Sequence, residues 1–193
     1  MQQKFYSKQL ILLGGGHSNI QVLEKLCMNE YTGLQTILIS ENYDATYSGL
    51  TPAYLQNQIK KSEISIDLQR LCFNAGVTFI KDRVVSLDPN NQSLDLQNHP
   101  RIDYDLLSIN TGSISKKVNI KTHDQAKIIM VKPINLFVEQ IEKIDKLVNK
   151  NENTQITIIG NGIAGYEICF SLYQRYKNKI SITLIGSKDI REK

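Results

Sequence analysis

Residues 10–19 read LILLGGGHSN, a short apolar run that ends in three consecutive glycines. An apolar run of this length is typical of a buried strand, and the glycines that follow it indicate a tight turn. Beyond the turn, apolar side chains recur at helical spacing at Ile20, Leu23, Leu26 and Cys27. The stretch therefore predicts a strand, a turn and a helix.

A second strand is predicted directly after this helix. Gly33 interrupts the helical pattern, and the β-branched run that follows, residues 36–39, ends at Ser40 and Glu41. A strand, a helix and a second strand in this order form a parallel pair, and parallel sheets are covered by helices. We therefore expect an α/β fold with a parallel sheet.

The same pattern occurs again 146 residues later, where residues 156–165 read ITIIGNGIAG. The following strands keep nearly the same spacing, since Thr36 lies 22 residues after Gly14 and Thr183 lies 23 residues after Gly160. Either turn alone has an ordinary βα connection as its alternative interpretation. The matched pair indicates two nucleotide-binding βαβ units of the Rossmann type.

Glycines at these positions have separate physical roles. The first permits the tight turn, the second lets the backbone approach a pyrophosphate, and the third lets helix and strand pack closely. The second turn has all three glycines, whereas the first has Asn19 at the third position. We expect Asn19 to loosen the close packing of its helix unless the helix tilts.

The remaining pattern predicts further elements and one boundary. A long shaped loop with room for a short helix is expected at 42–62, followed by a helix at 67–75 that ends at Gly76 in a left-handed cap. Strands are expected at 77–80, 84–87 and 93–96, with a central strand at 104–109. A helix is expected to begin near Pro133, and the second glycine turn and its helix lead to a strand at 180–185. The polar run at 149–154 is typical of a linker. It divides the chain into a first unit, 1–148, and a second βαβ unit, 149–193.

Composition excludes several classes of protein. With 41% hydrophobic and 22% charged residues among 193, the chain is globular. A net charge of +4 spread along the sequence argues against a nucleic-acid partner. No apolar stretch reaches the roughly 20 residues that cross a bilayer, and no signal peptide begins the chain, so we expect a cytoplasmic protein.

The cysteines suggest neither a disulfide nor a metal site. Cys27, Cys72 and Cys169 are far apart in the sequence and form no Cys-x-x-Cys pair. We expect them to be reduced and buried, and we expect no bound metal.

Taken together, these motifs resemble those of the FAD-dependent pyridine nucleotide(-disulfide) oxidoreductases. The most similar branch includes type II NADH dehydrogenase-like proteins and the flavoprotein module fused to selenide, water dikinase. The resemblance is based on residues 14–18, 47–52, 66–68, 104–113 and 160–167. It covers essentially the whole chain, and the order of the motifs is specific.

The resemblance implies cofactor roles for particular residues. Those beside FAD would be Gly14, Gly16, His17 and Ser18 at the pyrophosphate, Glu41 or Ser40 at the adenosine ribose, Ser48 to Pro52 near the isoalloxazine, and Thr111 and Gly112 along the dinucleotide. Those beside NAD(P)H would be Gly160, Gly162, Gly165 and Glu167. Asn110 stands where the family usually has alanine.

Some roles stay open in the sequence. Residues 186–188 include no acidic side chain that could accept hydrogen bonds from an adenosine ribose, so the sequence does not distinguish NADH from NADPH. Lys188 or Arg191 could bind a 2′-phosphate. We expect His17 to donate hydrogen bonds rather than protons, and we assign no catalytic residue. Stacking on flavin and ordinary packing are both open for Tyr43, Tyr47 and Tyr54. Cys169 is expected in the core.

The function implied by the resemblance is hydride transfer from NAD(P)H to FAD and onward to an acceptor such as a quinone. The alternative is a non-catalytic FAD-binding, nucleotide-binding or assembly module. A sulfide-oxidising flavoprotein would need cysteines that flank the flavin, and these cysteines do not suggest that arrangement.

Length indicates an incomplete enzyme. Two nucleotide-binding domains and an interface domain need on the order of 350 residues. The family's later FAD segment with a Gly-Asp turn and its C-terminal membrane-binding helix do not occur in this sequence. The resemblance therefore implies a truncated chain, with an incomplete FAD-binding domain at 1–148, the first βαβ unit of an NAD(P)-binding domain at 149–193, and the C-terminal half missing.

Overall fold

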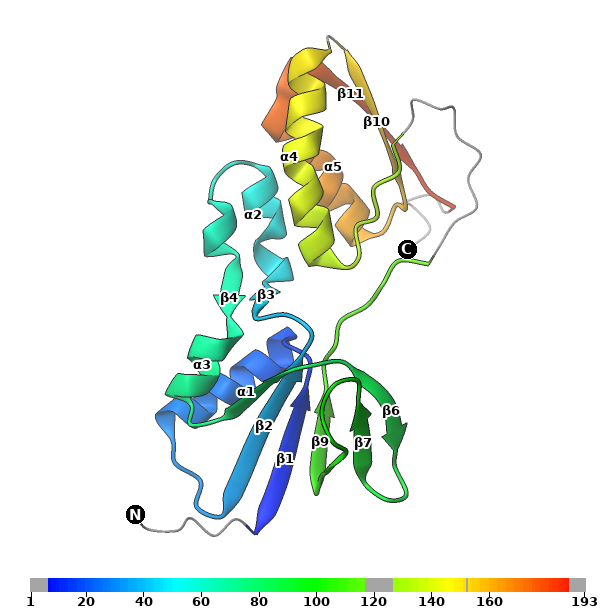
Figure 1. The fold of residues 1–193 in the computed structure, drawn as a ribbon. Helices are drawn as coiled ribbons and strands as arrows, with labels where there is room; N and C mark the ends of the chain where they lie inside the picture. The colour runs from blue at the N-terminus through cyan, green and yellow to red at the C-terminus, as the bar shows by residue number, and fades with distance from the viewer. Residues whose placement is uncertain (1–6, 117–126, 152, 188–193) are drawn as a thin grey trace. The chain divides into compact units, whose positions relative to one another are not determined.

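The computed structural model describes residues 7–116, 127–151 and 153–187. Contacts divide the chain into two compact units, which Figure 1 shows as ribbons. The first unit consists of Met1–Tyr47 and Ser65–Ser113, and the second consists of Ser48–Ile64 and Ile114–Lys193.

The first unit is a three-layer α/β structure. Its elements are β1 (Lys8–Leu13), α1 (His17–Met28), β2 (Leu34–Ser40), β3 (Asp44–Thr46), β4 (Ser65–Asp67), α3 (Leu68–Asn74), β5 (Thr78–Lys81), β6 (Val84–Asp88), β7 (Ser93–Leu96), β8 (Ile102–Asp103) and β9 (Leu106–Ile109). The main sheet has the order β5-β2-β1-β9, and all of its pairs are parallel. The expected α/β class and parallel sheet are confirmed.

Alternating side chains on the central strands fill two separate cores. Leu12 and Leu38 are fully buried on the face that packs against α1 and α3. Ile11 and Ile39 point to the other face, where the antiparallel sheet β6-β7-β8 covers them through residues such as Leu94. Because successive strand residues face opposite sides, an uninterrupted apolar run is what a strand covered on both faces requires.

Strand β9 differs from its prediction as a central strand. Among the described residues it lies at one end of the four-stranded order, paired only with β1. Leu107 packs in the core beside the antiparallel sheet, whereas Leu106 and Ile109 are 57% and 55% exposed. An apolar run indicates a strand but not its place in the sheet, because position depends on distant pairing.

The described part of the second unit contains three α-helices and a two-stranded parallel sheet. Its elements are 3-10 turns at Ser48–Leu50 (η1), Lys61–Glu63 (η2) and Lys177–Lys179 (η3), with α2 (Thr51–Leu55), α4 (Ile134–Lys150), β10 (Thr154–Ile159), α5 (Ile163–Tyr176) and β11 (Ile180–Ile185). Strands β10 and β11 pair in parallel, as the repeat predicted. Their inward isoleucines, such as Ile156 and Ile182, pack on the core beneath the helices.

The segment expected as a long loop joins this second core. Tyr54 and Leu55 of α2 are buried with Ile141 of α4 and Leu172 of α5. Helix α4 therefore packs with β10 and α5, and the boundary expected after residue 148 lies inside a compact unit. The polar run at 149–154 covers the end of α4 and the start of β10. A connection inside one unit and a linker between two domains can have the same polar composition, so composition does not distinguish these two cases.

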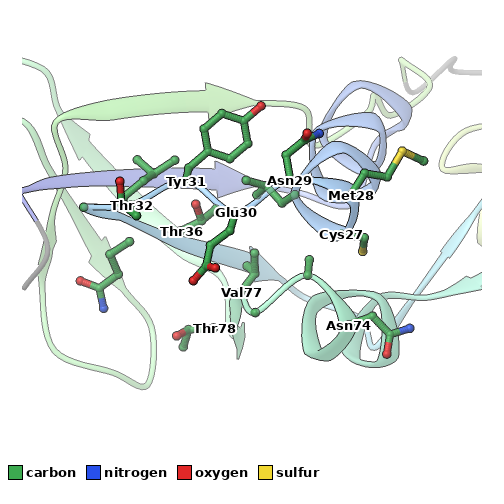
Figure 2. Close-up of a pocket in the computed structure, with 16 residues that line it drawn as sticks. Cys27, Met28, Asn29, Glu30, Tyr31, Thr32, Thr36, Asn74, Val77 and Thr78 are labelled. Atoms are coloured by element: carbon green, nitrogen blue, oxygen red, sulfur yellow. The ribbon is translucent and has the colours of Figure 1, made fainter. Parts of the chain in front are cut away.

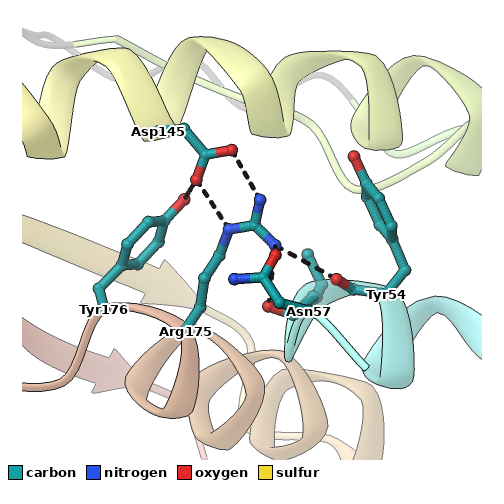
Figure 3. Close-up of polar contacts among 6 residues, drawn as sticks. Tyr54, Asn57, Asp145, Arg175 and Tyr176 are labelled. Carbon is teal, nitrogen blue, oxygen red and sulfur yellow. Dashed lines mark hydrogen bonds and ion pairs between the residues drawn. The ribbon is translucent and has the colours of Figure 1, made fainter. Parts of the chain in front are cut away.

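Arg175 of α5 holds three elements of the second unit together (Figure 3). Its guanidinium donates to both carboxylate oxygens of Asp145 on α4, at 2.7 and 2.6 Å. It also donates to the carbonyl oxygens of Tyr54 and Leu55 at 3.2 and 3.3 Å and to the side chain of Asn57. Because the Arg175 side chain is only 9% exposed, this fork is largely shielded from water.

Asp82 has a comparable role at the end of β5 in the first unit. Its buried carboxylate accepts hydrogen bonds from the main-chain N–H of Arg83, from the main chain and side chain of Asn98, and from the ring of His99. Burial alone would raise the Asp82 pKa, but these donors outweigh it and hold the pKa far below its usual value. The carboxylate thereby fixes the segment that follows β7.

Local predictions for turns and cysteines have mixed outcomes. Gly76, which follows the C-cap residue Ala75 of α3, has a φ of +65°, and this confirms the predicted left-handed cap. Cys72 is buried as expected, but Cys27 is exposed at the end of α1 and Cys169 is partly exposed. In the ranges the structure describes, no helix combines the length and apolar character that a membrane crossing requires.

Candidate functional site

The first glycine turn connects β1 to α1 at the carboxyl end of the sheet. Gly14 has a φ of +87°, a conformation that side chains disfavour, and its N–H donates to the carbonyl of Ile39 at 2.8 Å. Gly16 is the N-cap of α1, and its carbonyl accepts from the N–H of Ile20 at 3.1 Å. Ligands of open α/β sheets bind at this edge.

The turn packs closely on the residues that follow β9. The N–H of Asn110 donates to Leu13 at 2.8 Å, and the carbonyl of Asn110 accepts from Gly16 at 3.0 Å. A Cβ at Gly14 would lie 2.5 Å from that carbonyl oxygen and 2.6 Å from the Cα of Thr111. Gly14 and Gly16 therefore permit contact with this neighbouring turn, a requirement that sequence spacing did not reveal.

Amide groups at the start of α1 face an exposed surface. His17 and Ser18 are exposed, and the N–H groups of Gly15 and His17 donate to no acceptor among the described residues. Only the N–H of Ser18 has a side-chain acceptor, Oδ1 of Asn110 at 3.2 Å. Unpaired amides and the positive end of a helix dipole fit a phosphate group.

The structure corrects the expectation that Asn19 loosens the packing of α1. The side chain is fully buried, and its Nδ2 donates to the carbonyls of Leu13 and Gly14 at 3.1 and 2.8 Å. Its Oδ1 accepts from the hydroxyl of Ser108 on β9 at 2.7 Å. Asparagine therefore replaces close glycine packing with hydrogen bonds that tie the helix to the glycine turn and to β9.

The two residues expected at a ribose lie at the end of β2 and differ in exposure. Ser40 is buried, and its Oγ accepts from the N–H of Asn42 at 3.4 Å. Glu41 is exposed, and its carboxylate accepts from the Arg83 guanidinium at 2.8 Å. This hydrogen bond raises the Arg83 pKa. Arg83 was not identified from the sequence, because the pair joins residues 42 positions apart without a motif.

Aromatic side chains near the first turn pack against protein groups. The ring centroids of His17 and Tyr47 lie 5.0 Å apart. The ring centroids of Tyr43 and Phe79 lie 5.9 Å apart, and Nζ of Lys81 lies 4.4 Å from the centroid of the Tyr43 ring. Tyr54 belongs to the core of the second unit. The described contacts of all three tyrosines are with other protein side chains.

The second glycine turn repeats the hydrogen bonds of the first. The N–H of Gly160 donates to Ile185 at 2.7 Å, and the carbonyl of Gly162 accepts from Tyr166 at 3.2 Å. Strand register matches as well, since the pairs Leu13–Ile39 and Ile159–Ile185 are both offset by 146 residues. The internal repeat seen in the sequence is therefore a repeat of backbone geometry.

Space around the glycines of the second turn agrees with their expected roles. A Cβ at Gly165 would lie 1.9 Å from the carbonyl oxygen of Gly160, so helix and turn are packed too tightly for a side chain. A Cβ at Gly162 would meet no described atom within 4 Å. Gly162 thus has the open backbone that a bound pyrophosphate requires, and Glu167 is exposed on the same helix.

The other expected site residues are distributed over both units. Thr111 and Gly112 are exposed in the first unit beside Asn110, and Gly112 has a φ of +81°. Ser48 and Pro52 belong to η1 and α2 of the second unit. Thr51 between them is buried, and its hydroxyl has no hydrogen-bond partner among the described residues. Lys188 and Arg191 lie outside the described residues.

A cleft of about 530 Å³ lies at the opposite end of the first unit (Figure 2). It is lined by residues 26–36 and 74–78, where α1 and α3 end and β2 and β5 begin. Ligands of parallel sheets bind at the carboxyl ends of the strands rather than at this amino end. The cleft is therefore separate from the glycine turn and does not correspond to an expected site.

Two βαβ units with glycine turns of one geometry define a protein of the dinucleotide-binding class. The profile of the pyridine nucleotide-disulphide oxidoreductases matches residues 8–190. The chain therefore belongs to this family, as its motifs predicted.

Known proteins of this kind are similar to the chain over part of their length. Sulfide-quinone reductase of Aquifex aeolicus (strain VF5) is 32% identical over 109 residues, which are 55% of this chain and 24% of that protein. The alternative NAD(P)H-ubiquinone oxidoreductase C1 of Arabidopsis thaliana is 23% identical over 203 residues, covering 94% of this chain and 39% of the relative.

A solved structure supports the fold. The sulfide:quinone oxidoreductase of Aquifex aeolicus superposes with a TM-score of 0.70 at 22% identity, covering 93% of this chain and 43% of that structure. The chain thus spans less than half the length of each of these proteins.

Proposed function

We propose that this chain is the cofactor-binding part of an FAD-dependent NAD(P)H oxidoreductase. The observation that carries the proposal is the repeated turn, in which Gly14 and Gly160 make the same main-chain hydrogen bond to the neighbouring strand. One turn alone would suit many nucleotide-binding proteins, whereas two in one chain suit a protein that brings two dinucleotides together.

FAD is assigned to the first unit. The unpaired amides of Gly15 and His17 would hold its pyrophosphate, with Ser18 beside them. Glu41, exposed at the end of β2, is better placed than buried Ser40 to accept from the ribose hydroxyls. Thr111 and Gly112, exposed next to Asn110, would line the dinucleotide.

NAD(P)H is assigned to the second turn. The open space at Gly162 would admit its pyrophosphate, and the helix dipole of α5 would stabilise the negative charge. Ser48 and Pro52 are assigned to the isoalloxazine and Glu167 to the nicotinamide, both on the resemblance of their motifs. The choice between NADH and NADPH is not part of the proposal.

The redox chemistry would come from the cofactors, because flavin accepts a hydride from a reduced nicotinamide and then passes electrons onward. Residues of this chain would bind, orient and shield them. No side-chain acid or base is required for the hydride step, which agrees with the assignment of no catalytic residue. A quinone is the proposed acceptor class, because the names of both curated relatives include one.

Sulfide as an electron donor receives no support from the thiols. In the first unit, Cys27 and Cys72 lie at the ends of α1 and α3 that border the cleft of Figure 2, away from the glycine turn. Burial raises the pKa of Cys72, which keeps that thiol protonated and unreactive. These two thiols therefore do not contribute to the proposal, and the second glycine turn is what supports a pyridine nucleotide as the electron donor.

Reconstitution tests the proposal directly. The 193-residue chain, incubated with FAD and desalted, should stay yellow, and NADH or NADPH should bleach the flavin absorbance under anaerobic conditions. Retained flavin that neither nucleotide reduces would support the non-catalytic binding module instead. Failure to retain or bind FAD would overturn the assignment of the first unit.

A further inference from the structure

The side chain of Asn110 occupies the mouth of the first glycine turn. Its Oδ1 accepts from the N–H of Ser18 at 3.2 Å, and it lies 1.9 Å from the position that a Cβ on Gly16 would take. The main-chain carbonyl oxygen of Asn110 lies 2.5 Å from the same position, so Gly16 stays packed against Asn110 whichever way the side chain turns. A phosphate oxygen and the amide oxygen of Asn110 would compete for one donor, the N–H of Ser18.

We propose that Asn110 is an internal competitor of the dinucleotide phosphate and thereby sets the affinity of the first turn for FAD. The inference rests on the proposed function, because it takes FAD as the ligand of this turn. In the free protein the carboxamide caps α1, and on binding it rotates away so that the phosphate takes the N–H of Ser18.

Backbone contacts allow the side chain to move alone. The main chain of Asn110 is held by hydrogen bonds to Leu13 and Gly16, which continue the pairing of β1 with β9. Oδ1 has one hydrogen bond, to Ser18, and the residue is only partly buried. Rotation about the side-chain torsions would release the amide without disturbing the turn.

The second turn supplies an internal comparison. Its N-cap, Gly162, has nearly the same backbone angles as Gly16, with φ and ψ of −75° and 174° against −71° and 166°. No described atom lies within 4 Å of a Cβ at Gly162, whereas Asn110 stands against Gly16. Within the described ranges, therefore, a side chain caps the first turn, and none lies at the equivalent position of the second turn.

Residue type at position 110 determines the strength of the competition. An asparagine oxygen is a good N-cap acceptor, alanine has no acceptor, and an aspartate would cap the helix while repelling a phosphate. Loss of the cap removes a contact of the free protein that FAD binding must break. Asn110→Ala should therefore destabilise the free protein and strengthen FAD binding, a pair of opposite effects.

The test measures FAD affinity by quenching of flavin fluorescence in the 193-residue chain. Asn110→Ala should bind FAD about fivefold more tightly than wild type, which is the effect of one helix cap. Asn110→Asp should bind at least about fivefold more weakly. Asn74→Ala, an exposed asparagine at the end of α3, is the matched control and should leave the affinity unchanged.

A stability measurement separates competition from a merely structural role. Without FAD, Asn110→Ala should unfold at lower urea concentration than wild type, and saturating FAD should narrow that difference. If alanine perturbs folding, Asn110→Ser, whose shorter side chain reaches less far, provides the same comparison.

Two results would overturn the inference in different ways. Equal or weaker FAD binding by both Asn110→Ala and Asn110→Ser, with binding by wild type intact, rejects the competition and leaves the proposed function standing. Absence of FAD binding by wild type and every variant rejects the proposed function and this inference together.

Discussion

The hydroxyl of Ser108 donates to Oδ1 of Asn19 at 2.7 Å and so joins β9 to the first helix. On the opposite side of the same carboxamide, Nδ2 donates to Leu13 and Gly14. All three partners lie at the carboxyl ends of strands or in the turn itself. A single buried side chain thus holds the first glycine turn, its helix and the neighbouring strand in register.

Asn19→Ala should lower the free energy of unfolding by roughly 2–3 kcal/mol, because it leaves several buried polar groups without partners. Asn19→Gly, which restores the usual motif residue, should be no better, since glycine supplies no hydrogen bond and lowers helix stability. Urea denaturation measures both. Glu24→Ala, on the exposed face of α1, is the control and should change stability by less than about 0.5 kcal/mol. A stability of Asn19→Gly equal to wild type would contradict the bridging role.

Gly162 and Gly165 should respond differently to the same substitution. Gly165→Ala places a Cβ 1.9 Å from the Gly160 carbonyl oxygen and should cost about 2–3 kcal/mol of stability by overpacking. Gly162→Ala has open space and a φ of −75°, so stability should change by less than about 0.5 kcal/mol.

NADH binding should separate the two glycine variants further. The added methyl of Gly162→Ala blocks the approach of a pyrophosphate, so NADH affinity should fall about tenfold in a protein that is otherwise folded. Fluorescence titration with NADH, alongside urea denaturation, provides the measurement. Unchanged NADH affinity in Gly162→Ala would remove the second turn from the cofactor assignment.

Glu41 should matter for FAD binding and little for folding. Glu41→Gln removes the charged acceptor proposed for the ribose and should weaken FAD binding about tenfold. Its ion pair with Arg83 is exposed on both sides, so the loss of stability should be below about 1 kcal/mol. Arg83→Gln is the matched control, because it removes the same pair but keeps the carboxylate. Ser40→Ala tests the other residue expected at the ribose, and a larger effect there would shift the assignment to Ser40.

Local signals in the sequence were sufficient for much of the fold. Strand β11 coincides with its prediction, Ile180–Ile185, and both βαβ units have the predicted order and parallel pairing. Glycine turns, caps and apolar periodicity act over a few residues, so they can be read without knowledge of the remaining structure.

Long-range pairing accounts for what the sequence did not reveal. Glu41 and Arg83 are far apart in the chain, as are Arg175 and Asn57, and none of these pairs belongs to a recognisable spacing. The segment Ser48–Ile64 has the irregular pattern of a loop, yet it contributes Tyr54 and Leu55 to the second core. Asn19 was read as a defect in a glycine motif because its partner Ser108 lies on a distant strand.

Asp82 should make the stability of the first unit depend on acid pH. Its pKa is lowered in the folded state, so its contribution is complete above the pKa of about 4 that applies to an unfolded aspartate. That contribution is lost as the pH falls through the folded-state pKa. Asp82→Asn should be less stable at pH 7 and should lose less further stability between pH 5 and pH 2, as followed by urea denaturation. Asp103→Asn, an exposed aspartate on β8, should retain the acid dependence of wild type.

Arg175 should be the most sensitive polar residue of the second unit. Arg175→Met keeps much of the side-chain volume but leaves Asp145 partly buried without its ionic partner, and it strips the carbonyls of Tyr54 and Leu55 of a donor. We expect a loss of roughly 3 kcal/mol or more in the free energy of unfolding at pH 7, because breaking a largely buried pair from one side is costly.

Two further variants determine whether the charge of Asp145 causes that loss. Lys179→Met removes an exposed cation whose ammonium donates to Asn149 at 3.2 Å, and it should cost less than about 0.5 kcal/mol. The double variant Arg175→Met, Asp145→Leu removes both charges and should be more stable than Arg175→Met alone, since no unpaired carboxylate remains. A double variant less stable than Arg175→Met would contradict this explanation. It would show that the hydrogen bond from Tyr176 to Asp145, at 2.9 Å, stabilises the fold by more than the unpaired carboxylate destabilises it.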